Sequence, residues 1–216
     1  MTAPLDILSL DQMRACDQAA IASGTPGIEL MTRAGQAVAK AVMARWPQGP
    51  VLVLCGPGNN GGDGFVAAQG LAQAGWPVRL ALACPVAALK GDAAIAASHW
   101  TGPVESFTDL SLDGITLVID ALFGAGLSKP LETSLVQVLK GLEAAGLPII
   151  AIDLPSGLSG DTARLIGDYA PVCAATITFH RKKPAHVLTT GRQYCGEVIL
   201  ADIGLLPGLE IGRAHV

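Results

Sequence analysis

Residues 51–65 read VLVLCGPGNNGGDGF, and this stretch decides the fold class. Its first four residues, 51–54, are all apolar, which is typical of a short parallel strand that is covered on both faces. A glycine-rich loop follows at 56–64, and an apolar helix is expected from about 65 to 74. A strand, a glycine-rich turn and a helix in this order indicate one unit of a parallel α/β sheet.

The same alternation continues toward the C-terminus. Further strands are expected at 77–83, 115–119, 149–152, 174–179, 186–190 and 197–201, and further helices at 86–100 and 131–145. Two helical patterns, at 9–23 and 28–46, precede the first strand. The sequence therefore predicts an α/β protein with a three-layer Rossmann-like fold, a mostly parallel central sheet and extra N-terminal helices. We expect one domain over residues 1–216.

The composition excludes several classes of protein. The net charge is −4, from 18 acidic and 14 basic residues, and aromatic residues make up 4%, so a nucleic-acid partner is not expected. No apolar run reaches the roughly 18 residues of a membrane span, and no basic segment precedes an apolar N-terminus as in a signal peptide. The five cysteines form no CxxC pair, which favours reduced, buried thiols in a cytoplasmic protein; a catalytic cysteine is the alternative.

Three polar, glycine-containing loops follow expected strands, at 56–64, 120–126 and 153–157. In an open parallel sheet, ligands bind outside the carboxyl ends of the strands. We therefore expect these three loops to converge on one edge of the sheet and to form the functional site there.

The first loop fits neither common nucleotide motif. Gly56, Gly58 and Gly61 match GxGxxG, but residues 80–84 lack the acid that holds the ribose in an ordinary NAD site. No Gly-Lys-Ser/Thr follows, so the loop is not a P-loop either. A loop rich in free backbone N–H groups at the start of a helix still suits a phosphate. The alternative is a plain strand-to-helix turn with Asp63 as the helix cap.

Asp120 and Asp153 each end an expected buried strand, where a carboxylate binds a cation, caps a helix or transfers protons. With Asn60 and Ser156 they offer the hard oxygen ligands that suit a cation other than a transition metal. Residues 124–130 form either a second phosphate loop or an ordinary turn. The basic run 181–183 is interpreted as a solvated strand end or a phosphate contact. The histidines, which show no ligand spacing, are left unassigned: His99, His180, His186 and His215.

Three motifs in this order resemble the NAD(P)HX epimerase family, the N-terminal domain type of the YjeF-related proteins. They are CGPGNNGGDGF at 55–65, DALFG at 120–124 and DLPSG at 153–157, and the resemblance covers nearly the whole chain. One departure is Thr32, where members of the family commonly have a glutamate. A role for that acid is therefore not transferred to this chain.

The resemblance implies an isomerase that interconverts the R and S epimers of hydrated NADH and NADPH. A partner dehydratase would then convert the S epimer to the reduced cofactor. Asp153 would contact the substrate and act as the catalytic acid–base residue. One K⁺ per subunit would bind Asn60, Asp120 and Ser156. The other substrate contacts implied are Asn59, Asn60, Gly61, Gly62, Asp63, Gly124, Ala125, Gly126, Leu127, Ser128, Lys129 and Pro130. The resemblance also suggests a homodimer, and the apolar faces of the N-terminal helices are where we expect its interface.

Two other functions remain as alternatives. The first is a non-catalytic nucleotide-binding or RNA-related scaffold module of the same fold, which the joint presence of Asn60, Asp120, Asp153 and Ser156 disfavours. The second is a standard NAD-dependent oxidoreductase, which the missing ribose acid and the absence of a hydride-transfer constellation disfavour.

Overall fold

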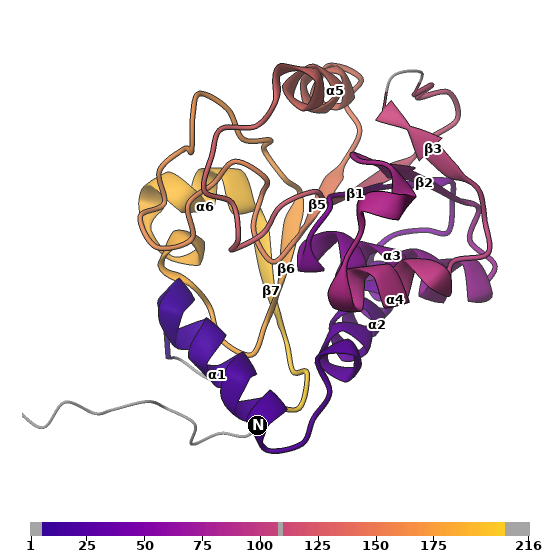
Figure 1. The fold of residues 1–216 in the computed structure, drawn as a ribbon. Coiled ribbons are helices and arrows are strands. Elements are labelled where there is room, and N and C mark those ends of the chain that lie inside the picture. The colour runs from indigo at the N-terminus through magenta and orange to yellow at the C-terminus, as the bar shows by residue number, and fades with distance from the viewer. Residues whose placement is uncertain (1–5, 108–109, 206–216) are drawn as a thin grey trace, which may run out of the picture.

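The computed structural model describes residues 6–107 and 110–205 (Figure 1). Its centre is a seven-stranded sheet in the order β3-β2-β1-β4-β5-β6-β7, in which every neighbouring pair is parallel. The strands are β1 (Val51–Cys55), β2 (Val78–Leu82), β3 (Val104–Ser106), β4 (Leu117–Ala121), β5 (Ile149–Ile152), β6 (Ala175–Phe179) and β7 (Glu197–Ala201). The predicted parallel sheet is confirmed.

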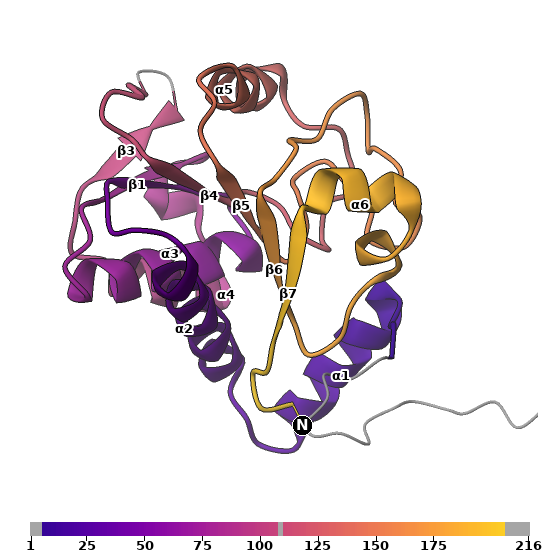
Figure 2. The same ribbon diagram turned by 180° about the vertical axis from the view of Figure 1, so that it is seen from behind.

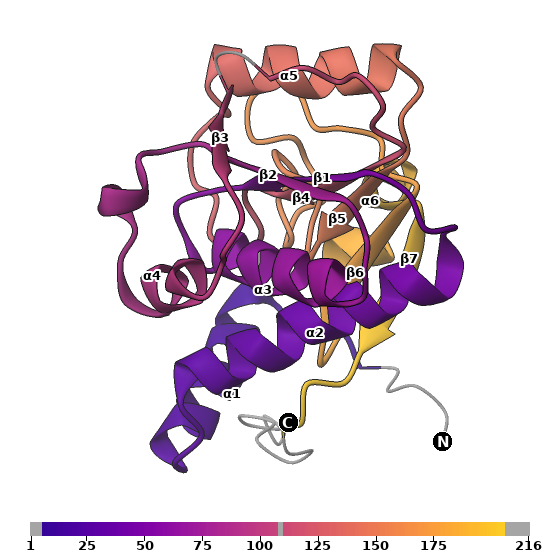
Figure 3. The ribbon, with the colours of Figure 1, turned by 90° about the vertical axis from the view of Figure 1, so that its right-hand side faces the viewer.

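Helices cover both faces of this sheet, which gives three layers (Figure 3). On one face lie α2 (Gly27–Arg45), α3 (Asn59–Gln73) and α4 (Gly91–Ser98). On the other lies α5 (Thr133–Ala144), and the short α6 (Thr189–Cys195) precedes β7. Central strands β1, β4, β5 and β6 are buried along their whole length, as their apolar sequences require in a sheet with two covered faces.

The glycine-rich segment does not form the predicted long loop, because α3 already begins at Asn59 with Gly58 as its N-cap. Its glycines allow a close approach to the sheet: a Cβ at Gly61 would lie 1.9 Å from the Gly56 carbonyl oxygen. A Cβ at Gly64 would lie 2.5 Å from that of Ala121. Asp63 lies inside the helix, so its predicted alternative role as the cap is wrong. The glycines, which usually disfavour a helix, are thus the residues that allow α3 to pack closely against the sheet.

Two other expected elements differ from the structure, and one strand was not expected. Residues 186–190 form no strand, because Pro184 starts a 3₁₀ turn (Pro184–His186) and α6 follows. Residues 86–100 form a 3₁₀ turn (Val86–Ala88) and α4, separated where Lys90 is extended and Gly91 has a φ of +56°. The short edge strand β3 carries no apolar run and was not predicted.

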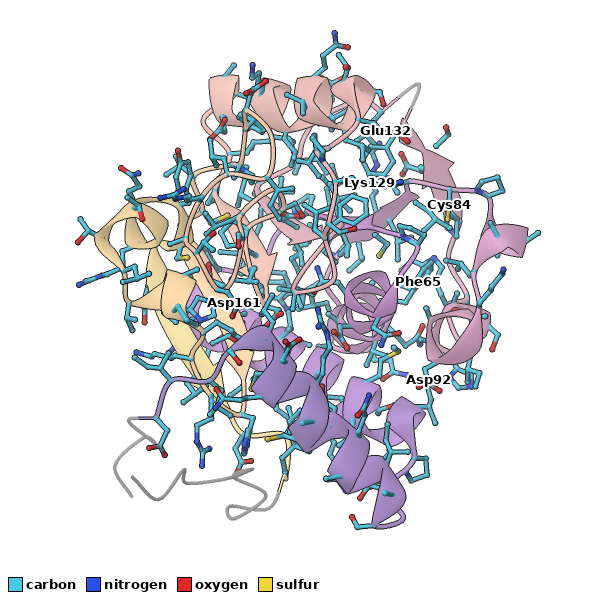
Figure 4. The ribbon with its side chains drawn as sticks, turned by 60° about the vertical axis from the view of Figure 1, so that its left-hand side comes forward. Phe65, Cys84, Asp92, Lys129, Glu132 and Asp161 are labelled. Atoms are coloured by element: carbon cyan, nitrogen blue, oxygen red, sulfur yellow. The ribbon has the colours of Figure 1, made fainter. Side chains whose placement is uncertain are left out.

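Helix α1 (Leu10–Ala22) lies apart from these layers, beside the ends of β6 and β7 (Figures 1 and 2). Ser9 caps it in a reciprocal capping box with Gln12. The carboxylate of Asp161 also accepts a hydrogen bond from the Leu10 N–H at 2.8 Å, and Figure 4 shows Asp161 beside the first turn of α1. In the described ranges, no helix combines the length and apolarity that crossing a bilayer requires.

Candidate functional site

A cavity of about 630 Å³ opens at the carboxyl edge of the sheet. All three loops that the sequence singled out contribute to its wall, together with one side of α1 and the first half of α2. One part of the wall is polar and contains Asp63, Asp153 and Lys183, whereas another is apolar and contains Met13, Leu30 and Met31 among others. A large cavity with a few convergent polar groups at this edge is the expected place for a ligand.

Asp153 is the centre of the polar part. It follows β5, and its Oδ1 accepts hydrogen bonds from Lys183 Nζ at 2.6 Å and Thr178 Oγ1 at 3.0 Å. Its Oδ2 accepts a longer bond from the Ala125 N–H at 3.3 Å. The Asp153 side chain is 13% exposed and that of Lys183 is 3% exposed, so this ion pair lies at the base of the cavity.

The charge state of Asp153 follows from this pairing. Burial alone would raise the pKa of the carboxyl, but Lys183, His186 and Thr178 together lower it below the usual range for aspartate. Asp153 is therefore ionised at neutral pH. Lys183 keeps its ammonium group between this carboxylate and Thr178 Oγ1, to which it donates at 2.8 Å.

The backbone of Asp153 is also held in an uncommon conformation. Its φ is +67°, a region that few residues other than glycine occupy, and its N–H donates to the Ile177 carbonyl at 2.7 Å. His186 Nδ1 accepts from the Lys183 N–H at 3.0 Å, so the proton of the neutral ring is on Nε2, which donates to the Asp153 carbonyl at 2.8 Å. Residues 177–186 therefore fix the direction in which this carboxylate points.

Asp120 and Ser156 form a second polar pair, which is fully buried behind the cavity wall. Ser156 Oγ donates to Asp120 Oδ1 at 2.7 Å, and its backbone N–H donates to Oδ2 at 2.9 Å. The backbone N–H groups of Leu122 and Phe123 complete the network by donating to Asp120 Oδ1 and Ser156 Oγ. Burial raises the pKa of Asp120, and the hydrogen bonds from Ser156 and Leu122 oppose that rise.

Asn60 lies beside Asp153. A Cβ on Gly124 would lie 2.8 Å from Asn60 Oδ1 and 3.1 Å from Asp153 Oδ2, so the two side chains meet over this glycine. The Asn60 Nδ2 atom is buried and has no hydrogen-bond partner in the described protein. A buried N–H donor that the protein leaves unsatisfied points to a hydrogen-bond acceptor on a ligand at this place.

Two more carboxyl groups face the cavity, Asp63 from α3 and Asp17 from α1. Burial, with smaller contributions from Asp153 and Asp17, raises the pKa of Asp63 well above its ordinary value. Burial also raises the pKa of Asp17 to about 6, against the opposing influence of Lys183. The cavity thus combines an ionised carboxylate with carboxyl groups that hold their protons more tightly.

The residues predicted for the site are distributed over three environments. Those on the cavity wall are Asn59, Asn60, Asp63, Gly124, Ala125, Gly126, Leu127 and Asp153. Four are buried behind it: Gly61, Gly62, Asp120 and Ser156. The remaining three, Ser128, Lys129 and Pro130, are exposed beyond the wall, and Figure 4 shows Lys129 well away from α1. The structure thus brings the three predicted loops together, as expected.

Four residues of this candidate site were not predicted to belong to it: Asp17, Thr178, Lys183 and His186. The basic run was interpreted as solvated or as a phosphate contact, but Lys183 is 2% exposed and binds a carboxylate instead. Because this run follows β6, it begins at the same carboxyl edge of the sheet as the other three loops. This position in the sequence was the feature that could have indicated that Lys183 belongs to the site. Nothing in the sequence indicated that Asp17 belongs to the site, since the sequence did not predict where the first helix lies relative to the sheet.

Comparisons with known proteins agree with this geometry. The family model described as YjeF-related protein N-terminus matches residues 27–185. A Rhodobacter capsulatus protein named NAD(P)H-hydrate epimerase is 43% identical over 196 residues, which cover 84% of this chain and 91% of that protein. A Coxiella burnetii protein named bifunctional NAD(P)H-hydrate repair enzyme Nnr is 36% identical over 198 residues, 90% of this chain and 40% of that protein.

The crystal structure of yeast ynu0, YNL200c, shares the fold, with a TM-score of 0.72 at 22% identity over 92% of this chain and 87% of the yeast chain. The family resemblance noted in the sequence and the expected α/β architecture are both confirmed. Since the family model matches well over half of the chain and the first relative is aligned almost end to end, this chain belongs to the family of YjeF-related protein N-termini.

Proposed function

We propose that this chain is an NAD(P)H-hydrate epimerase, an isomerase that interconverts the R and S epimers of hydrated NADH and NADPH. The observation that carries the proposal is the ionised Asp153, which Lys183 and Thr178 orient at the base of a large cavity. This site is present in a chain that aligns with nearly the whole length of a protein named for the same reaction.

The substrate would bind along the cavity between α3 and the loop after β4. The first turn of α3 has no side-chain cap, so its free backbone N–H groups suit the pyrophosphate. Asn59, Asn60 and Asp63 would contact the dinucleotide there, and residues 124–127 would contact it from the opposite loop. The exposed residues Ser128, Lys129 and Pro130 would act at the outer end, nearer to solvent.

The reaction needs proton transfer at one ring carbon. In the hydrated cofactor this carbon carries a hydroxyl beside the ring nitrogen, as in a hemiaminal. When the hydroxyl is protonated, it leaves as water, and the nitrogen lone pair forms an iminium-like intermediate. Water that adds to the other face, and gives up a proton to Asp153, produces the other epimer.

A potassium ion fits the residues behind the cavity wall. The fully buried Asp120 carboxylate has no cationic side chain among the ion pairs of the described residues. Asn60, Asp120 and Ser156 would hold the ion through hard oxygen atoms. When bound, it would supply positive charge next to the loops at 120–126 and 153–157 and so hold them in place.

Two partners belong to the proposal. The first is an NAD(P)HX dehydratase, because the epimerase only supplies the epimer that such an enzyme uses; the Coxiella burnetii relative is named bifunctional. The second is another copy of this chain, in a homodimer through the N-terminal helices. Gel filtration with light scattering is the test of the dimer, and a species of 22 kDa alone would contradict it.

A coupled assay tests the function. The R epimer of hydrated NADPH is supplied with an excess of an S-specific dehydratase, and the rate of NADPH recovery is measured with and without this chain. We expect an acceleration that Asp153→Asn removes while its unfolding temperature stays within a few degrees of the wild type. No acceleration by the folded wild-type chain in the presence of K⁺ would instead favour the non-catalytic binding module.

A further inference from the structure

One side of α1 faces the cavity. Leu10, Met13, Arg14, Asp17 and Ile21 all contribute to the wall, and their spacing of three or four residues places them on one stripe of the helix. Asp17 is the acidic member of this stripe, whereas Asp11 points to solvent and pairs with Arg14 at 2.6 Å. The helix therefore presents one carboxyl group to the cavity, from an element separate from those that carry Asp153 and Asp63.

The position of α1 is fixed by its N-terminus. The capping box of Ser9 and Gln12 defines the start of the helix, and Asp161 holds the Leu10 N–H at 2.8 Å. The Leu10 side chain packs so closely on Gly160 that a Cβ there would lie 2.7 Å from Leu10 Cδ2. Figure 4 shows α1 in front of the sheet edge, with Asp161 at its first turn and Phe65 of α3 to its right. Asp17 is thus held in place two turns after the anchored end.

The charged groups that face Asp17 come from several elements. Lys183 follows β6, Asp153 follows β5, Asp63 belongs to α3, and Arg14 lies on the same helix. Burial is the largest cause of the raised pKa of Asp17, which reaches about 6, and Asp153 adds to it while Lys183 opposes it. With this pKa, Asp17 carries its proton in about half of the molecules at pH 6 and in about one in ten at pH 7.

The proposed reaction needs an acid as well as a base. Because Lys183 keeps Asp153 ionised, Asp153 takes the proton of the incoming water in one direction, and another group must protonate the leaving hydroxyl; in the reverse direction the two groups exchange roles. Because water leaves from one face of the ring and returns to the other, two groups on separate walls of the cavity meet the requirement better than one.

We propose that Asp17 is the second catalytic residue of the proposed epimerase and donates the proton to the leaving hydroxyl group. The C–O bond breaks, its electron pair leaves with the protonated oxygen as water, and the nitrogen lone pair forms the C=N bond of the iminium. A water then adds to the opposite face and transfers one proton to Asp153. The proton returns from Asp153 to Asp17 through water in the same cavity, so the cycle consumes nothing. This inference rests on the proposed function.

Asp63 is the competing candidate for the same role. Burial raises the pKa of Asp63 as well, so both carboxyl groups hold a proton more tightly than an ordinary aspartate. Asp63 also lies on α3 beside the proposed pyrophosphate contacts. We assign to Asp63 a neutral hydrogen bond to the substrate rather than proton transfer.

The test compares four variants with the wild type in the coupled assay. They are Asp17→Asn, Asp17→Glu, Asp63→Asn and the matched control Asp11→Asn on the exposed side of the same helix. The value of kcat/KM is measured from pH 5 to 9 and corrected for spontaneous epimerisation at each pH. Unfolding temperatures and far-UV circular dichroism show whether each variant is folded.

We expect the wild-type kcat/KM to fall as the pH rises through the pKa of Asp17, near 6 in the free enzyme. Asp17→Asn should lower kcat/KM by about 100-fold or more and abolish this fall, since a general acid contributes roughly 10²–10⁴-fold to the rate. Asp17→Glu should keep the pH dependence with part of the activity, and Asp11→Asn should match the wild type.

Three results would overturn the role of Asp17. They are a wild-type profile in Asp17→Asn, a lower rate in Asp17→Asn with an unchanged pH dependence, and loss of the pH dependence in Asp63→Asn alone. In each of these results the wild type still accelerates the reaction, so the proposed function survives. A wild type without any activity overturns both proposals.

Discussion

At the scale of single residues, the buried pair of Asp153 and Lys183 sets both chemistry and stability. Asp153 could be predicted from the sequence because an acid at the end of a buried strand lies at the carboxyl edge. The place of Lys183 after a strand pointed to the same edge, but its burial could not be predicted, because three consecutive basic residues are typical of a solvated segment. The buried position of Lys183 depends on the ion pair with a residue 30 positions away, and such a pairing leaves no local pattern in the sequence.

Removal of Lys183 should be costly unless Asp153 is neutralised at the same time. Lys183→Met leaves a buried carboxylate without its counter-ion, which should lower the free energy of unfolding by about 3–5 kcal/mol at pH 7. Because the lowered pKa of Asp153 depends on Lys183, this deficit should shrink as the pH falls and the carboxyl protonates. Urea denaturation at pH 7 and pH 4.5 measures both effects.

The matched control is the double variant Lys183→Met, Asp153→Asn, which carries no charge at this position. It should recover most of the lost stability, because a neutral pair of similar volume removes the uncompensated charge. A double variant less stable than Lys183→Met alone would contradict the assignment of the loss to charge burial.

His186 should make the protein sensitive to mild acid. Burial, and then Lys183, lower its pKa from 6.5 in the unfolded chain to about 4 in the folded one. Between these two values the unfolded chain binds the proton more readily, so stability should fall as the pH drops from about 6.5 to 4. The contribution is about 3 kcal/mol, from roughly 1.36 kcal/mol per pKa unit.

His186→Gln isolates this contribution, since an amide offers a donor and an acceptor without titrating. The difference in free energy of unfolding between wild type and His186→Gln should be largest above pH 6.5 and smallest near pH 4. A difference that stays constant across this range would show that His186 does not titrate as its surroundings imply.

At the scale of elements, the start of α3 shows how far a sequence pattern reaches. Glycines at 61, 62 and 64 indicated a loop, because glycine is unfavourable inside a helix by about 1 kcal/mol. In the structure they lie against the carbonyl of Gly56, the side chain of Met31 and the strands β1 and β4. A run of glycines forms either a loop or a closely packed part of a helix, and packing between distant elements decides which. The run alone therefore led to a predicted helix start six residues after the observed one.

Gly61→Ala should therefore destabilise the protein although alanine favours helices. Its Cβ would lie 1.9 Å from the Gly56 carbonyl oxygen, and backbone at such a position has little room to move. We expect a loss of about 2–4 kcal/mol in the free energy of unfolding, similar to other changes that overfill a packed site.

Gly141→Ala in α5 is the control, because nothing lies within 4 Å of the added Cβ and the residue is inside a helix. This variant should be more stable than the wild type by about 0.5–1 kcal/mol. Equal effects of the two substitutions would show that helix propensity, rather than contact with the sheet, governs α3.

At the scale of the whole molecule, the topology of the sheet brings the loops of the candidate site together. Strands β1, β4, β5 and β6 are neighbours and parallel, so the segments that follow them end on one edge even though they lie up to about 120 residues apart in the sequence. This convergence could be predicted from the alternation of strands and helices. The placement of α1 over that edge could not, because it depends on single tertiary contacts such as Asp161 with the Leu10 N–H.

Because of this topology, the proposed potassium ion should stabilise the folded chain as a whole. The Asp120 side chain pairs with Ser156 from the next strand's loop, so an ion held between these loops would bind the folded chain and not the unfolded one. With K⁺ at ten times its dissociation constant, the free energy of unfolding should rise by about 1.4 kcal/mol. For a chain of this size that is an increase of about 3–6 °C in unfolding temperature.

The measurement replaces K⁺ by choline at constant ionic strength, and the Asp120→Asn variant should show no difference in unfolding temperature between the two salts. An unfolding temperature of the wild type that is the same in both salts would leave the Asp120 carboxylate without the counter-ion proposed for it, and this result is independent of any assay of epimerase activity.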